Sequence, residues 1–295
     1  MTPPLTGRAQ DLERDHPEWK PWLGVLEEVV RESADPQWDK VVPAAPDRQE
    51  SKIPGLAGAT LELQPSLVRR WTERLMRAAV RSGTAQMATL DRATDNGIDL
   101  FHLLKAALCQ DLEPLQQIAH HLEVDPEAFK AVAVLLPTPL LHACHRAWRA
   151  SIERSWVEGY CPVCGAWPAF AEVCGIERSR YLRCGRCGGG WEARCLFCPY
   201  CGMADHEELA SLVPEKSGSK GVIEVCKRCL GYVKSFTLLQ GTSPDKVIFD
   251  DLASVELDVA ALEAGYKKAA GLGYALDITV VGALGRTNKF FPWRS

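Results

Sequence analysis

The sequence predicts an α+β fold, with an α-helical N-terminal half followed by a strand-rich, cysteine-rich region and a closing helix. Three observations lead to this expectation. Helical periodicity of apolar residues dominates the chain as far as about residue 157. Glycine, cysteine and β-forming residues then prevail up to about residue 241. Ten of the 12 cysteines lie in this second stretch, between Cys161 and Cys229.

The N-terminal half, residues 1–157, is expected to form a helical domain. Its first helix should cover about Glu18–Ser33, and Pro43–Gly58 should be an extended connector. Another helix should begin at Pro65, because proline is tolerated in the first turn of a helix. Further helices are expected near residues 84–93, 98–109, 112–122, 125–135 and 138–156.

The cysteine-rich region is expected to contain two modules, residues 158–195 and 196–241, followed by a C-terminal part at 242–295. A hairpin turn should form at Lys216–Lys220, and the last helix should cover Ser254–Ala270 and pack on one of the modules. Short strands are expected at Ala169–Val173, Arg180–Arg183, Gly190–Ala193, Gly221–Val225 and Val233–Leu238.

Four pairs of cysteines carry the strongest functional signal. Two residues separate the cysteines of each pair, so a tight turn can present both thiolates to one metal ion. In three pairs a glycine follows the second cysteine and supplies the positive φ of such a turn; in the fourth the glycine comes one residue later. Thiols in a reduced cytosol favour metal binding over disulfides. The pairs are Cys161/Cys164, Cys184/Cys187, Cys198/Cys201 and Cys226/Cys229.

Sequential pairing gives two sites of four thiolates each. The intervals of 19 and 24 residues between the paired cysteines leave room for a hairpin, as in zinc-ribbon and rubredoxin-like modules. Four thiolates suit tetrahedral zinc and rubredoxin-type iron alike, so the sequence predicts two ions per chain and leaves their identity open. A closed site has no position for a reactive water, which argues against a hydrolytic zinc enzyme.

Length and charge exclude several classes of protein. The 295 residues are enough for about two domains of ~150 residues. The formal net charge of −4 argues against a nucleic-acid coat. No apolar stretch approaches the ~18 residues of a membrane span, and the first residues do not resemble a secretory signal. We therefore expect a cytoplasmic protein without membrane insertion.

Other reactive residues give weaker signals. Cys195 forms an overlapping pair with Cys198, but only Cys198/Cys201 has both an internal proline and a following glycine. Cys195 and Cys174 should therefore be free thiols, either small buried side chains or redox-active groups. His142 and His145 are expected to be structural, and no catalytic residue or cofactor-binding loop stands out.

Five arginines near the first site form a basic cluster. Over residues 158–241, ten Lys/Arg stand against nine Asp/Glu, so we expect the cluster to face a protein partner rather than nucleic acid. The arginines are Arg178, Arg180, Arg183, Arg186 and Arg194.

Taken in order, the motifs CPVCG, RYLRCGRCGGGW, CPYCG, CKRCLGYVK and FDDLASVELD resemble the formate dehydrogenase accessory protein family known as FdhE. The resemblance extends over essentially the whole chain, and its specific part lies in residues 158–270. The eight paired cysteines carry over as metal ligands, and iron is the metal associated with the family.

This resemblance implies two rubredoxin-like modules beside an α-helical domain. It also implies a cytoplasmic, non-catalytic assembly factor that binds the catalytic subunit of a respiratory formate dehydrogenase before export. Two other functions stay open, a rubredoxin-like electron carrier and a nucleic-acid-binding zinc-ribbon protein. Whether the chain forms a homodimer also stays open.

Overall fold

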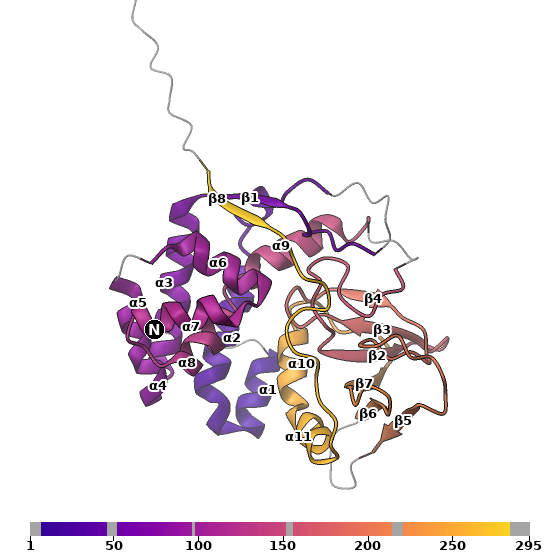
Figure 1. Cartoon of the computed structure of the whole chain (residues 1–295). Helices are drawn as coiled ribbons and strands as arrows, with labels where there is room; N and C mark the ends of the chain where they lie inside the picture. Colours follow the sequence, from indigo (N-terminus) through magenta and orange to yellow (C-terminus); the bar gives the residue numbers. More distant parts are fainter. Residues whose placement is uncertain (1–6, 46–51, 96–97, 152–155, 214–220, 284–295) are drawn as a thin grey trace, which may run out of the picture.

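The computed structural model describes residues 7–45, 52–95, 98–151, 156–213 and 221–283. Helices gather on one side of the molecule and a six-stranded sheet on the other, with the last two helices beside the sheet (Figure 1). Both cysteine clusters lie in the strand-rich part. This is the α+β arrangement predicted from the sequence.

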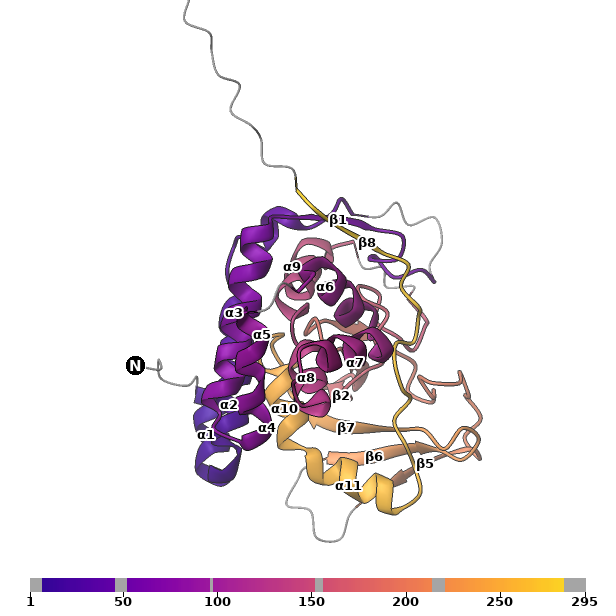
Figure 2. The ribbon, with the colours of Figure 1, turned by 60° about the vertical axis from the view of Figure 1, so that its left-hand side comes forward.

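The helical half is built around two long helices that pack side by side, α2 (Lys20–Ser33) and α3 (Pro65–Arg81) (Figure 2). The predicted start at Pro65 is confirmed, and Trp71 of α3 is fully buried. The other helices are α1 (Gly7–Asp15), α4 (Ala85–Ala88), α5 (Arg92–Asp95), α6 (Leu100–Cys109), α7 (Leu112–His121), α8 (Pro126–Ala133) and α9 (Thr138–Trp148), with 3₁₀ turns at Pro17–Trp19, Asp39–Val41 and Thr89–Asp91.

Aspartate caps begin three of these helices. The side chains of Asp99, Asp111 and Asp125 accept backbone N–H groups of the first turns of α6, α7 and α8. α9 ends at Trp148, earlier than the expected residue 156. The stretch Pro126–Trp148 is apolar and long enough to cross a membrane, but 72% of its apolar window is buried inside the protein, as in a core helix.

One mixed sheet contains the strands of both predicted modules. Neighbouring strands are antiparallel except β2 and β7, which run parallel with Phe170 opposite Lys234. Each predicted module contributes three strands, and the two modules meet at this parallel pair. The five predicted strands are confirmed, whereas β5 was not predicted. The order is β4 (Gly190–Glu192), β3 (Ser179–Arg183), β2 (Phe170–Cys174), β7 (Tyr232–Leu238), β6 (Gly221–Cys226) and β5 (Leu209–Leu212).

The C-terminal helix differs from the expectation. Instead of one helix over Ser254–Ala270, the chain forms α10 (Val247–Ala253) and α11 (Val255–Glu263). The Ser254 hydroxyl donates to the carbonyls of Asp250 and Asp251, which marks the break between the helices. α11 packs on β6 and β7, as predicted. The predicted turn at Lys216–Lys220 lies outside the described residues.

A second sheet consists of two strands that are far apart in the sequence. β1 (Thr60–Leu63) pairs in parallel with β8 (Thr279–Gly282), and Figure 1 shows the yellow end of the chain beside the indigo strand. Neither strand was predicted. The tail thereby returns from the metal region to the helical half. The predicted boundaries at 157/158, 195/196 and 241/242 stay predictions.

The main hydrophobic core runs from the helices into the first cysteine cluster. Trp148 of α9, Leu182 of β3 and the four cysteines of that cluster belong to one group of buried residues. A separate, smaller core lies between α11 and the sheet and contains Ile223 and Leu257. The two clusters therefore have different surroundings, one inside the main core and one outside it.

Candidate metal centres

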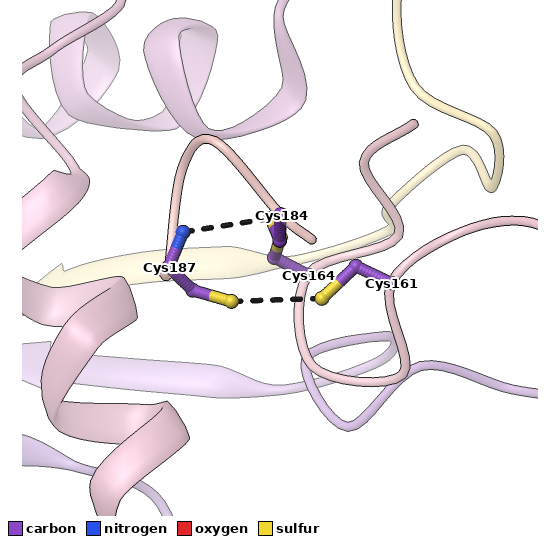
Figure 3. Close-up of side chains that lie close together, drawn as sticks. All are labelled: Cys161, Cys164, Cys184 and Cys187. Carbon is purple, nitrogen blue, oxygen red and sulfur yellow. Dashed lines mark hydrogen bonds between the residues drawn. The ribbon is translucent and has the colours of Figure 1, made fainter. Parts of the chain in front are cut away.

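Site one consists of Cys161, Cys164, Cys184 and Cys187, which two turns bring together (Figure 3). The sulfur atoms of Cys161 and Cys187 lie 3.6 Å apart, and those of Cys164 and Cys184 lie 3.5 Å apart. None of the four residues is more than 1% exposed. A tetrahedral ion with metal–sulfur bonds of about 2.3 Å requires sulfur–sulfur distances of about 3.8 Å, so the donor set fits such an ion.

Backbone N–H groups point at the sulfur atoms of site one. Val163 N–H donates to Cys161 Sγ, Cys187 N–H to Cys184 Sγ, and Gly189 N–H to Cys187 Sγ. These bonds stabilise negative charge on sulfur, which thiolate ligands carry. The arrangement therefore favours the ionised form that binds metal.

The environment of site one shifts the pKa values of its thiols in opposite directions. Burial raises the pKa of Cys161, whereas hydrogen bonds from the other three thiols lower the pKa of Cys184. Cys184 is therefore the thiol whose ionised form its neighbours stabilise directly. A bound cation supplies the charge that lets the remaining thiols ionise.

Site two consists of Cys198, Cys201, Cys226 and Cys229, with sulfur distances of 3.6 Å for Cys198–Cys229 and 3.7 Å for Cys201–Cys226. These distances also fit a tetrahedral ion. In contrast to site one, Cys201 is exposed and Cys229 is partly exposed. Each cluster can hold one metal ion, and only site two presents a ligand to solvent.

The left-handed backbone turn expected after each pair is present at all four. Glycine adopts it after three pairs, with φ of 68°, 68° and 73° at Gly165, Gly188 and Gly202. After the fourth pair Leu230 itself adopts φ of 56°, so the later glycine, Gly231, does not take over this role. The turn is a common requirement of the four pairs rather than a consequence of glycine.

An aromatic contact joins the two sites. Trp167, which follows the first cysteine pair, meets Tyr200 of the third pair edge-on, with ring centroids 5.2 Å apart. Tyr160, directly before Cys161, lies 6.2 Å from Trp167 on the other side. The metal-binding turns of the two modules are thus in side-chain contact.

The basic cluster predicted near site one is largely internal. Arg180 is 2% exposed and donates to the Glu224 carboxylate, and Arg183 is buried beside Glu172. Arg186 donates to the carbonyls of Leu108 and Ala107 at the end of α6. The interpretation of these arginines as a partner-facing patch is therefore wrong for three of the five. Arg178 and Arg194 are exposed.

The other thiols and histidines singled out in the sequence belong to neither cluster among the described residues. Cys195 is exposed and Cys174 is partly exposed; both are free. His142 is buried in α9, consistent with a structural role. His145 packs against the second turn of site one, since a Cβ atom on Gly189 would lie 2.7 Å from its ring.

One buried charge near site two was not predicted. Lys234 of β7 is fully buried, and its Nζ lies 2.6 Å from Asp251 and 2.8 Å from Asp258. Asp258 also accepts the hydroxyl of Tyr232, and the Tyr200 hydroxyl donates to the Tyr232 carbonyl. This network connects site two to α10 and α11. The alternation of side chains along β7 could have predicted that Lys234 faces inward. It could not have predicted which carboxylates pair with Lys234.

Comparison with known proteins adds independent information. Residues 193–273 match the family model described as "FdhE, C-terminal domain". A protein named "Protein FdhE homolog" from Aquifex aeolicus is 33% identical over 137 residues, which cover 44% of this chain and 46% of the relative. A homologue from Rhizobium meliloti is 29% identical over 196 residues, 65% of this chain and 58% of the relative.

"Protein FdhE" of Escherichia coli is 32% identical over 123 residues, which cover 41% of this chain and 38% of the relative. The matches thus span about half the length of these curated relatives. The crystal structure of the FdhE protein from Pseudomonas aeruginosa has the same fold, with a TM-score of 0.57, 22% identity, and coverage of 91% of this chain and 93% of that chain. Residues 193–273 thus resemble the C-terminal domain of FdhE proteins, and the chain has the fold of one of them.

Proposed function

We propose that this protein is a cytoplasmic maturation factor of formate dehydrogenase that binds the catalytic subunit of that enzyme and catalyses no reaction of its own. The observation that carries the proposal is the pair of closed four-cysteine clusters in a chain that resembles FdhE proteins. Closed thiolate sites stabilise a fold and leave no open coordination position for a substrate. Such a protein acts through its surface.

The eight cysteines of sites one and two are the proposed ligands of two ions. Iron is the metal we propose, with zinc as the alternative, since tetrahedral sulfur donors suit both. Metal binding would contribute directly to folding, because the unfolded chain cannot hold eight thiolates in place. Site one in particular would connect the sheet to the helical half through the main core.

An electron carrier is the second candidate, and the exposure of Cys201 at site two favours it. If site two held iron, a solvent-facing ligand would give a redox partner access to the metal. Reversible one-electron titration of bound iron would support this function, and redox-silent zinc would exclude it. Nucleic-acid binding has less support, because Arg180, Arg183 and Arg186 are paired with carboxylates or backbone carbonyls of the protein itself.

The test is anaerobic co-purification from the native host with an affinity-tagged chain. We expect the formate dehydrogenase catalytic subunit to be retained by the wild type and by Cys174→Ser, and to be lost with Cys161→Ser/Cys164→Ser. Circular dichroism and metal analysis of that variant separate loss of binding from loss of the fold. If the catalytic subunit is absent from the wild-type eluate at low salt concentration, the proposal is wrong.

A further inference from the structure

The outer edge of β5 is open. β5 is the last strand of the sheet, and no described segment pairs with its outer side. The backbone N–H of Lys227 donates to the carbonyl of Glu208, which fixes the phase of the ladder between β5 and β6. Because alternate residues of an antiparallel strand turn both backbone groups to the same neighbour, Leu209 and Ser211 direct theirs outward.

β5 is a short edge strand of four residues, and none of these residues blocks pairing with an added strand. Natural edge strands are commonly blocked by lysine, proline or a bulge. Residues 209–213 read LASLV and contain neither a charge nor a proline. Val213, directly after the strand, is 72% exposed. The edge therefore offers unpaired hydrogen-bonding groups in an apolar surrounding.

A pocket of about 170 Å³ adjoins the edge. The loop Cys195–Tyr200 covers one side, and β5, β6 and β7 form the other. Leu196, 55% exposed, Phe197 and Leu209 line it, and Cys198 and Cys226 of site two contribute to its wall. Since a cavity of about 150 Å³ accepts benzene, the pocket has room for one aromatic or branched aliphatic side chain.

We propose that the outer edge of β5 binds an extended segment of the formate dehydrogenase catalytic subunit as an added strand, with one apolar side chain of that segment in the pocket. The inference rests on the proposed function and specifies its surface. In this binding mode backbone hydrogen bonds supply affinity, and a pocket for an alternate side chain supplies specificity. Because two ligands of site two form part of the pocket wall, an assembled site two shapes the binding surface.

The experiment compares Ser211→Pro with Ser211→Ala. Proline removes the outward N–H at a position where an edge strand tolerates it, whereas alanine removes only the hydroxyl. The probes are the full-length catalytic subunit and overlapping synthetic peptides from it, each of about 12 residues. We expect Ser211→Pro to weaken binding of the subunit and of one peptide by at least about tenfold, and Ser211→Ala to bind as the wild type does.

A second pair of variants tests the pocket. Leu196→Glu places a charge at the rim and should weaken the same peptide, whereas Ile176→Glu should not. Ile176 is 99% exposed in the turn between β2 and β3, at the opposite end of the sheet from site two. Far-UV circular dichroism and two bound metal ions per chain show that each variant is folded.

The outcomes separate the two proposals. If the subunit binds wild type, Ser211→Pro and Leu196→Glu equally, the edge inference is wrong and the proposed function stands. If the wild type binds neither subunit nor peptides, the proposed function itself fails. If Ser211→Pro converts a dimer into a monomer without affecting subunit binding, a second copy of this chain occupies the edge and the inference is overturned.

Discussion

Three buried basic side chains of the sheet are paired with carboxylates, two within the sheet and one on α10 and α11. Lys234, Arg180 and Arg183 project from adjacent parts of the sheet, and each meets a carboxylate. Burial of a charge is tolerated only when a partner of opposite sign compensates it. These side chains therefore hold defined positions, and loss of one leaves its partner uncompensated.

Lys234→Met tests the most buried of them. We expect the free energy of unfolding to fall by about 3 kcal/mol, because Asp251 and Asp258 lose the fully buried one of the two lysines that they share. Lys268→Met is the matched control: Lys268 contacts the same two aspartates but is 35% exposed, so the loss should stay below about 1 kcal/mol. Urea unfolding at equal metal content measures both, and equal losses would contradict the prediction.

His142 gives the stability a dependence on pH. Burial is the main cause that lowers its pKa to about 4, from 6.5 in the unfolded chain. As pH falls, the imidazole of the unfolded chain binds a proton at a higher pH than that of the folded protein. The contribution of His142 to stability is therefore fully present above pH 6.5 and is lost as pH falls toward 4. The loss should reach about 3 kcal/mol over this window.

Urea unfolding of wild type and His142→Gln between pH 7 and pH 4 checks this prediction. The variant should lack that part of the pH dependence, whereas His102→Gln, at an exposed position, should keep it. The same slope in the wild type and His142→Gln would show that other groups cause the acid sensitivity.

Among the elements, the four cysteine turns share one backbone requirement. Each needs a residue in the left-handed region directly after its second cysteine, and three turns meet it with glycine. In the fourth turn Leu230 adopts φ of 56°. A side chain in this conformation costs roughly 1–2 kcal/mol, so the fourth turn stores strain at a metal site.

Leu230→Gly should relieve that strain. We expect a gain of about 1 kcal/mol in stability, because Leu230 is 47% exposed and little apolar burial is lost. Gly202→Ala, at the corresponding place in the third turn, should have the opposite sign, since its φ is 73° and nothing else crowds the new Cβ atom. Thermal unfolding of the metal-loaded variants measures both; a destabilised Leu230→Gly would contradict the strain argument.

At the scale of the whole molecule, the two cysteine clusters differ in exposure. Site one is enclosed by the core that the helices and the sheet share, and site two lies at the surface beside a smaller core. Exchange with solvent requires access to a ligand, and only site two offers one in Cys201. The sites should therefore differ in metal exchange.

A chelator should remove the two ions in separate steps. We expect native mass spectrometry after addition of EDTA to show a one-metal species that persists, with the remaining ion in site one. Cys201→Ser should remove the fast step and leave the slow one. Release of both ions at one rate would show that the sites open together, for example through the contact between Trp167 and Tyr200.

Much of the fold follows from local sequence patterns. Pro65, Asp125 and the apolar spacing of α2 and α3 act within a few residues, so α2, α3 and α8 could be placed from sequence alone, whereas α1 was not predicted. β1, β5 and β8 could not, because they are four residues long and depend on partners distant in the chain. The break at Ser254 depends on a side-chain bond that periodicity does not reveal.

The candidate metal sites, too, could be predicted from the sequence only in part. Spacing alone groups the eight cysteines into the two clusters that the structure brings together, because each turn is local and each hairpin short. The difference in exposure between the sites could not be foreseen, since it depends on where α9 and the main core lie. The basic cluster misled for the same reason: Glu224, 44 residues from Arg180, and the end of α6 are not adjacent in sequence.

The pairing of β1 with β8 has a consequence for synthesis on the ribosome. Leu61 and Leu63 are fully buried, and the strand that completes their sheet is Thr279–Gly282. A nascent chain can form the helices and both cysteine clusters, yet β1 stays unpaired until β8 has left the exit tunnel. The small sheet of the helical half is therefore completed only after translation has passed β8. A prematurely terminated product exposes an unpaired strand with two leucines, which proteases and chaperones can recognise.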